Sequence, residues 1–132
     1  MTLLRNVLRW QAVRWGLVGA LLAVAPRAVV AGWLSQRGVF DTFWIRTLGI
    51  TSIVIAAQIV LVRRKLEELW WWAWSFVLLE VATGVLAAAH ILTDPPPGSA
   101  EWPFVVAAVV NLAFAAVGIV GLAKAGTERS PA

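Results

Sequence analysis

The 132-residue chain has no cysteine, no tyrosine and a single histidine. Without cysteine it cannot form disulfides, thiolate metal sites or a thiol nucleophile. A transition-metal site that needs several imidazoles cannot be assembled from one histidine in one copy of the chain. The sequence therefore predicts no metal site, no cofactor and no catalytic residue.

Charge is also scarce. Asp, Glu, Lys and Arg make up 14% of the residues, hydrophobic residues make up 61%, and the mean hydropathy is +0.81. A soluble domain of this length needs more charge to cover its surface, so we expect a single domain embedded in a lipid bilayer. The net charge of +4 comes from residues at the ends of apolar runs. It is a signal of membrane topology and does not indicate nucleic-acid binding.

Long apolar runs make up most of the sequence. About 20 helical residues cross a hydrocarbon core of about 30 Å, so the runs predict an all-α fold, an integral membrane four-helix bundle with up-down topology. We expect spans over residues 9–25, 43–62, 69–92 and 102–123, followed by a frayed tail over 124–132. Asp41 or Thr42 is expected to cap the second span and Ser99 the fourth, with Pro103 tolerated in the first turn of the fourth.

Pro26 leaves two readings of the first span open. Either one kinked helix continues to Leu34, or the span ends near Ala25 and an interfacial helix follows over residues 26–36. The second reading is preferred because it keeps Arg27 out of hydrocarbon. In that helix Val29, Val30, Trp33 and Leu34 would face lipid. A cleavable signal peptide ending at Ala25 is a further alternative, disfavoured by the proline directly after it.

The basic residues predict an orientation. One side of the membrane is expected to hold Arg5, Arg9, Arg14, Arg63, Arg64, Lys65, Lys124 and Arg129. The other side would hold Arg27, Arg37 and Arg46. Because cytoplasmic loops carry the excess of Lys and Arg, both termini are predicted in the cytoplasm of a multi-pass inner (plasma) membrane protein.

The chain is rich in tryptophan, with nine residues. They are expected to form aromatic belts at the two membrane surfaces, where amphipathic rings gather. The inner belt would hold Trp10, Trp15, Trp70, Trp71 and Trp72, and the outer belt Trp33, Trp44 and Trp102. We therefore interpret the cluster from Trp70 to Trp74 as anchorage rather than as a stacking site for a ligand.

Glu80 is the residue that most needs an explanation, because it lies near the middle of the third span. A carboxylate at that depth costs a few kcal/mol or more unless it is protonated or paired. At 100° per residue it shares a small and polar helix face with Ala73, Gly84 and Ala87, with Thr83 close by. Glu80 is therefore expected to point into the bundle.

Several partners for Glu80 are possible at the same depth. Asn111 is the first choice, followed by Thr51 or Ser52. A further alternative is that Arg27 or Arg46 reaches down to Glu80 from the outer side. Glu80 then either holds helices together by an interhelical hydrogen bond, takes part in a proton or cation relay, or recognises a ligand. Thr83 and His90 complete the set of candidate ligand- or ion-binding residues, His90 lying nearer the outer end of its helix, beside Arg46, Asp94 and Glu101.

The stretch WIRTLG, from Trp44 to Gly49, opens the second span after a basic N-terminus and a span that ends at Pro26. In this order of features, and in the pattern of Arg46, Leu48 and Gly49, the chain resembles the small DoxX-like four-helix membrane proteins. The resemblance implies the same fold. Some members of that family are accessory subunits of quinone-linked oxidoreductases, so it also implies a subunit role or a lipid-soluble ligand. It implies no cofactor-binding residue.

These sequence features lead us to expect one of three functions. The first is an accessory or interaction subunit of a membrane complex, or a bundle that binds lipid or quinone. The second is a small oligomeric transporter or channel, with Glu80 as the coupling residue. An enzyme ranks last, because acid and base chemistry needs at least two tuned groups near a substrate, and Glu80 and His90 are nearly three helical turns apart. Expected partners are the bilayer and a membrane protein or a second copy of the chain.

Overall fold

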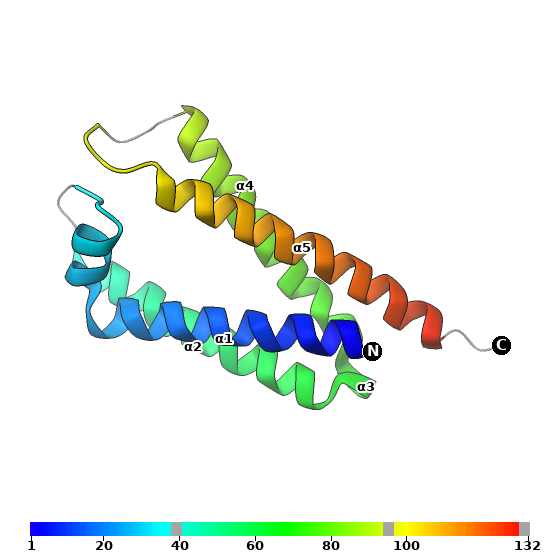
Figure 1. The fold of residues 1–132 in the computed structure, drawn as a ribbon. Helices are drawn as coiled ribbons and strands as arrows, with labels where there is room; N and C mark the ends of the chain where they lie inside the picture. Colours follow the sequence, from blue (N-terminus) through cyan, green and yellow to red (C-terminus); the bar gives the residue numbers. More distant parts are fainter. Residues whose placement is uncertain (38–40, 94–96, 130–132) are drawn as a thin grey trace.

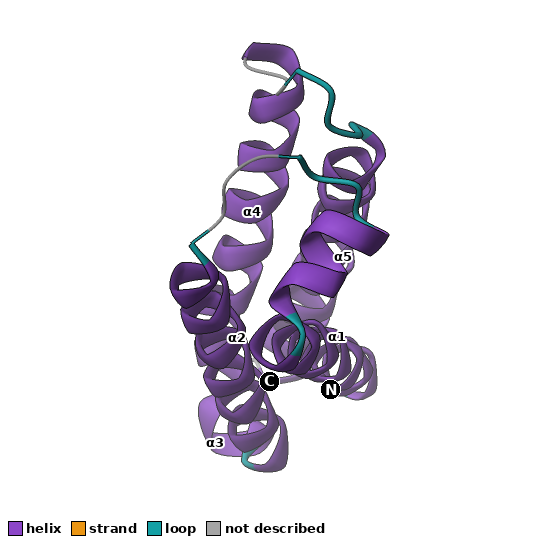
Figure 2. Cartoon of the chain, turned by 90° about the vertical axis from the view of Figure 1, so that its left-hand side faces the viewer, coloured by secondary structure: helices purple, strands orange, loops and turns teal. Residues whose placement is uncertain are grey.

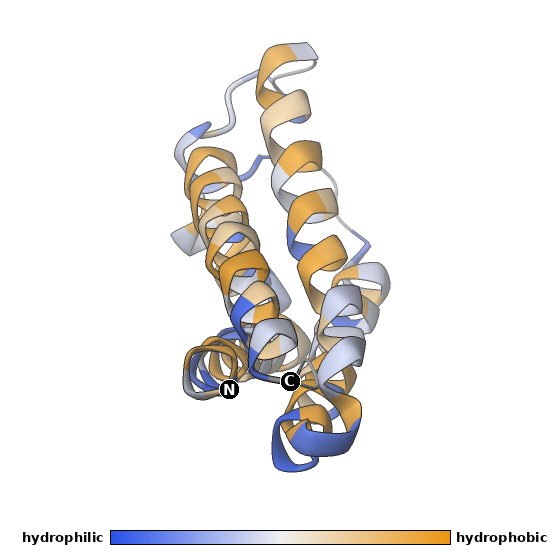
Figure 3. Cartoon of the chain, turned by 90° about the vertical axis from the view of Figure 1, so that its right-hand side faces the viewer, coloured by the Kyte–Doolittle hydropathy of each residue, from blue (hydrophilic) through white to orange (hydrophobic). Residues whose placement is uncertain are grey.

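The computed structural model describes residues 1–37, 41–93 and 97–129, and in these residues all regular secondary structure is helical (Figure 2). Four helices are long and apolar enough to cross a membrane: Thr2–Val24, Thr42–Arg64, Leu66–Thr93 and Trp102–Glu128. Apolar residues run along the length of these helices (Figure 3). The expected all-α four-helix bundle is confirmed.

The helices form two hairpins (Figure 1). In the first, α1 (Thr2–Val24) packs along α2 (Thr42–Arg64). In the second, α4 (Ala73–Thr93) packs along α5 (Trp102–Arg129). The short helix α3 (Leu66–Leu69) and the 3-10 turn η2 (Trp70–Trp72) connect them and continue into α4. The start of α1 and the end of α5 lie at the same end of the bundle, which we call the terminal end (Figure 1).

The hydrophobic core lies towards the terminal end. Leu4 and Leu8 of α1, Ile59 of α2 and Leu122 of α5 are among its completely buried side chains. Each fully buried leucine or isoleucine side chain contributes about 1.5–3 kcal/mol in water, whereas in lipid close packing replaces that term. The two hairpins are therefore joined here by side-chain packing, and Gly121 brings the α5 backbone close to Leu4.

At the opposite end, which we call the loop end, hydrogen bonds between loops join the hairpins. The backbone amide of Ala100 donates to the Ser35 carbonyl (3.2 Å), and the side-chain amide of Gln36 donates through Nε2 to the Ala100 carbonyl (2.8 Å). The Arg37 amide donates to the Ser99 hydroxyl (2.9 Å). The predicted cap role of Ser99 is thus wrong, because its hydroxyl bonds the first hairpin instead of the start of α5.

Two glycines set the crossing of α1 and α2. A Cβ added to Gly19 would lie 2.6 Å from the Gly49 carbonyl oxygen, and one added to Gly49 would lie 2.6 Å from the Ala23 amide nitrogen. Both contacts are with backbone, which cannot move aside locally. Only glycine allows the two helix axes to approach this closely, as small residues do in membrane helix pairs.

Helix α1 ends before Ala25, because the φ of −130° and ψ of 56° of this residue are not helical. Pro26 follows and opens a separate helical turn that leads into the π-helix η1 (Ala28–Trp33). Proline lacks the amide hydrogen that a continuous helix needs, and it disfavours helical geometry in the residue before it. The second reading of Pro26 matches this break, but Val29 is buried, so the expected lipid-facing position of that residue is wrong.

Two helices extend beyond their expected ends. α1 begins at Thr2 instead of near residue 9, because Leu4, Val7 and Leu8 pack into the bundle. α5 continues to Arg129, so residues 124–129 are helix and not the expected frayed tail. The N-terminal amine binds the Glu128 carboxylate (2.5 Å) and ties this last turn to α1. Gly38 and Asp94 lie outside the described residues.

Candidate functional site

Glu80 is completely buried, as expected from its helix face. Ala73, Gly84 and Ala87 of the same face are buried too. Val77, expected on another face, is also buried, and its Cγ2 would lie only 2.8 Å from a Cβ at Gly118. The carboxylate thus enters the bundle between the two hairpins.

Three donors from α1 converge on one oxygen of this carboxylate. The Gln11 amide nitrogen (3.1 Å), the Trp15 indole nitrogen (3.0 Å) and the Arg14 guanidinium all donate to Glu80 Oε1. Residues at positions i, i+3 and i+4 lie on one helix face, so a single face of α1 presents all three groups. Arg14 and Glu80 form an ion pair, which leaves the centre of the bundle without net charge from these two groups.

Arg14 is held on several sides. A second nitrogen of its guanidinium donates to Asn111 Oδ1 of α5 (2.9 Å), and the Asn111 amide nitrogen donates to the Ala107 carbonyl (2.6 Å), which fixes the orientation of the asparagine. The guanidinium also lies 5.1 Å from the ring centroid of Trp15 and 4.9 Å from that of Phe114. We call Gln11, Arg14, Trp15, Glu80 and Asn111 the central polar network.

Two buried atoms of the central polar network, Glu80 Oε2 and Arg14 Nε, have no hydrogen-bond partner among the described residues. Charge-assisted hydrogen bonds are the strongest in proteins, and a buried charge without a partner is correspondingly costly. Glu80 Oε1 accepts three hydrogen bonds, whereas Glu80 Oε2 accepts none from the described residues. The central polar network can therefore hold the two hairpins in register. Glu80 Oε2 remains available to accept a further hydrogen bond.

No family model, curated protein or solved structure matches the chain. The DoxX-like resemblance therefore stays a prediction.

The other predicted candidates do not bond to the Glu80 carboxylate within the described residues, although the Thr83 hydroxyl also lies 3.5 Å from the Glu80 backbone carbonyl. Thr51 is exposed and donates to the Thr47 carbonyl of its own helix (2.8 Å). Thr83 donates to the Leu79 carbonyl. His90 packs against the Phe104 ring near the loop end, with 4.4 Å between ring centroids. Arg46 is exposed at the start of α2 and lines a pocket there.

Asn111 joins the site, but through Arg14 rather than through a direct bond to Glu80. Ser52 is buried and donates to the Leu48 carbonyl (2.8 Å). The expectations that Thr51 or Ser52 would bond to Glu80, or that Arg27 or Arg46 would reach down to it, are wrong.

The sequence reading missed Gln11, Arg14 and Trp15. The sequence pattern predicts Arg14 on one side of the membrane and Trp15 in an aromatic belt, because residues 1–14 read as an amphipathic basic stretch and the chain is uniformly apolar only from Trp15. Since α1 begins at Thr2, Arg14 lies about 18 Å along the helix, a depth that matches the middle of a span. The signal that would have found the site is the polar triplet at i, i+3 and i+4 in α1.

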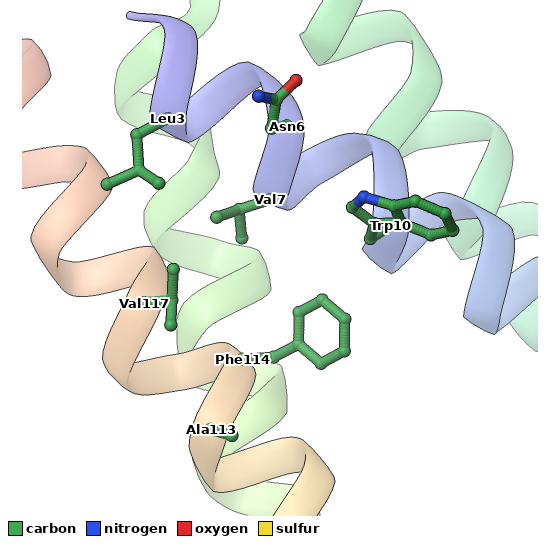
Figure 4. Close-up of a pocket in the computed structure, with 7 residues that line it drawn as sticks. All are labelled: Leu3, Asn6, Val7, Trp10, Ala113, Phe114 and Val117. Carbon is green, nitrogen blue, oxygen red and sulfur yellow. The ribbon is translucent and has the colours of Figure 1, made fainter.

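A lateral groove lies between α1 and α5 beside the central polar network (Figure 4). Its volume is about 350 Å³, and its exposed lining is apolar. We call it the α1–α5 groove, lined by Leu3, Asn6, Val7, Trp10, Ala113, Phe114 and Val117. Phe114 connects the two features, since its ring lines the groove and also contacts the Arg14 guanidinium.

Proposed function

We propose that this chain is a small integral membrane protein that binds a lipophilic molecule in the α1–α5 groove, as a lipid- or quinone-binding subunit of a membrane complex. The single observation that carries the proposal is the groove itself. Its volume of about 350 Å³ lies within the range of roughly 300–1,000 Å³ typical of small-molecule sites, and its exposed surface is apolar. An acyl or isoprenoid chain, or a quinone ring, fits such a lining.

The aromatic residues of the groove support a ring-bearing ligand. Trp10 is 61% exposed on one wall and Phe114 comes from the other, so a flat ring can stack against either face. The Arg14 cation next to Phe114 is fixed by Glu80 and Asn111. Because Glu80 compensates this cation, the groove is expected to hold its ligand by apolar and aromatic contact rather than by charge.

The proposal places the chain in the inner (plasma) membrane, with up-down topology and both termini in the cytoplasm. We also propose that the chain belongs to the DoxX-like membrane proteins, from which an accessory role is expected. In support, four helices are apolar enough to cross a membrane, and the start of α1 and the end of α5 both lie at the terminal end. The basic triplet from Arg63 to Lys65 lies at the turn between α2 and α3, where α2 ends at Arg64.

The test is photolabelling with a quinone that carries a diazirine in its side chain, on the full chain in lipid nanodiscs. Ala113→Trp fills the groove and is expected to abolish labelling of the peptides around residues 3–10 and 113–117. Ala116→Trp is the matched control, because Ala116 is exposed on the same helix outside the groove lining. Labelling that is equal in wild type and Ala113→Trp would count against the proposal.

A small oligomeric transporter or channel is the second candidate, favoured by the buried Glu80 Oε2, which no donor in the described part of the chain reaches. In that function Glu80 is the proton- or cation-coupling residue. The Arg14 ion pair opposes it, because Arg14 already occupies one oxygen of the carboxylate with a fixed cation. If Glu80→Gln left proton-linked flux in reconstituted vesicles unchanged, this candidate would fail.

A further inference from the structure

We propose that Arg27 and Arg46 form a binding site for a phosphate-bearing anion at the loop end of the bundle. The site is a pocket of about 330 Å³ between η1 and the start of α2, lined by residues 24–28 together with Thr42 and Arg46. It shares no lining residue with the α1–α5 groove. The inference therefore does not depend on the proposed function.

The backbone break at Ala25 creates this pocket. Because Pro26 ends the first helix and opens a new turn, Arg27 lines a cavity against α2 instead of extending along α1. Thr42 and Arg46 are four residues apart in α2, so their side chains lie on one face of that helix. Two segments of the chain thus each contribute one arginine to the lining of one cavity.

Neither guanidinium is neutralised within residues 1–37, 41–93 and 97–129, where the side chains of Arg27 and Arg46 make no hydrogen bond or ion pair. Other arginines differ: Arg14 pairs with Glu80, and Arg5 lies 3.9 Å from Glu67. Asp41 is the nearest acid in sequence to the start of α2, and its carboxylate accepts the Phe43 amide (2.9 Å) as a helix cap. Two like charges at one cavity repel each other until an anion enters.

The donor set selects phosphate. A guanidinium presents a planar fork of N–H groups that matches the oxygens of a phosphate two at a time. The Thr42 hydroxyl adds a neutral donor to the cavity lining. Trp33 and Trp44, 64% and 68% exposed, lie close by in sequence. Such rings mark the level of lipid headgroups, so a phospholipid headgroup and free phosphate are the two sources of this chemistry.

The experiment uses the full chain, purified in a non-ionic detergent, and native mass spectrometry to titrate phosphatidylglycerol against phosphatidylcholine. Arg27→Gln/Arg46→Gln is expected to bind phosphatidylglycerol at least about tenfold more weakly than wild type, the loss expected for charge-assisted hydrogen bonds. Arg27→Lys/Arg46→Lys keeps the charge but not the fork, so it is expected to lie between the two. Arg37→Gln/Arg64→Gln is the control that removes two exposed charges outside the pocket.

A second arm titrates sodium phosphate by calorimetry. Binding of inorganic phosphate that Arg27→Gln/Arg46→Gln abolishes assigns the site to the free anion. Arginine-dependent binding of phosphatidylglycerol alone assigns it to a lipid headgroup, and both results support the site. Circular dichroism checks folding, and the single variants Arg27→Gln and Arg46→Gln replace the double variant if it loses helicity. Equal binding of both probes by wild type and the pocket variants overturns the inference, as does an equal loss in the Arg37→Gln/Arg64→Gln control.

Discussion

Arg14 and Glu80 are separated by 66 residues in the chain, yet they form the ion pair that joins the two helical hairpins at their middle. Glu80 is completely buried, whereas Arg14 keeps 24% of its side chain exposed. The carboxylate therefore depends on the arginine for its charge compensation, and the arginine depends on the carboxylate for its position.

The first prediction concerns this ion pair. Arg14→Met is expected to destabilise the fold by about 3–5 kcal/mol, because it leaves the buried Glu80 charge uncompensated. The double variant Arg14→Met/Glu80→Leu is expected to recover most of that loss, since an apolar pair of similar volume needs no compensation. Unfolding in mixed micelles, followed by circular dichroism, measures both, with Arg64→Met as an exposed control. Additive losses in the double variant would show that the two residues are not coupled.

The second prediction isolates one donor. Trp15→Phe keeps an aromatic ring beside Arg14 but removes the indole N–H that bonds to Glu80. The expected loss of unfolding free energy is about 1 kcal/mol, the usual net contribution of one hydrogen bond. Trp74→Phe is the matched control, because Trp74 is 47% exposed. The same loss in both variants would argue against a specific role for the Trp15 bond.

The third prediction compares two glycines of α1. Gly19→Ala is expected to destabilise the fold, because the new Cβ would lie 2.6 Å from the Gly49 carbonyl and push α1 away from α2. Gly16→Ala is expected to be neutral or stabilising by up to about 1 kcal/mol, since its nearest contact is an ordinary 3.6 Å to Ala56 Cβ and alanine favours helix. Thermal unfolding in detergent distinguishes them. Effects of the same sign would refute the backbone contact.

The fourth prediction is the orientation in the membrane. Fluorescent-protein fusions at either terminus are expected to be bright in the cytoplasm, and alkaline phosphatase fusions at the same points to be inactive. Neutralising Arg63, Arg64 and Lys65 together is expected to weaken this preference, because they form the basic cluster at the C-terminal end of α2. Active phosphatase at both termini of the unaltered chain would reverse the proposed topology.

Apolar length and helix faces made most of the fold predictable. Four long apolar runs gave the number of helices, and the small face around Glu80 gave the direction of its side chain. The Asp41 cap was also foreseen and is confirmed by its bond to the Phe43 amide. These features depend on local sequence, where periodicity and capping act directly.

The site was predictable only in part. Asn111 was expected at the depth of Glu80 and does join the network, but Arg14 was assigned to the membrane surface. The error came from the start of α1, because seven more helical residues carry the arginine to the bundle centre. The tight α1–α2 contact was missed as well: Gly19 and Gly49 meet across two helices, and no spacing within one helix shows which partner it will have.

Synthesis of the chain runs from α1 to α5, so Arg14 is made 66 residues before the carboxylate that compensates it. The first hairpin must therefore exist for a time with an arginine at its centre that has no acid to face. Insertion of the second hairpin removes that penalty. A chain that stops after α2 therefore lacks the carboxylate that pairs with Arg14 in the four-helix bundle.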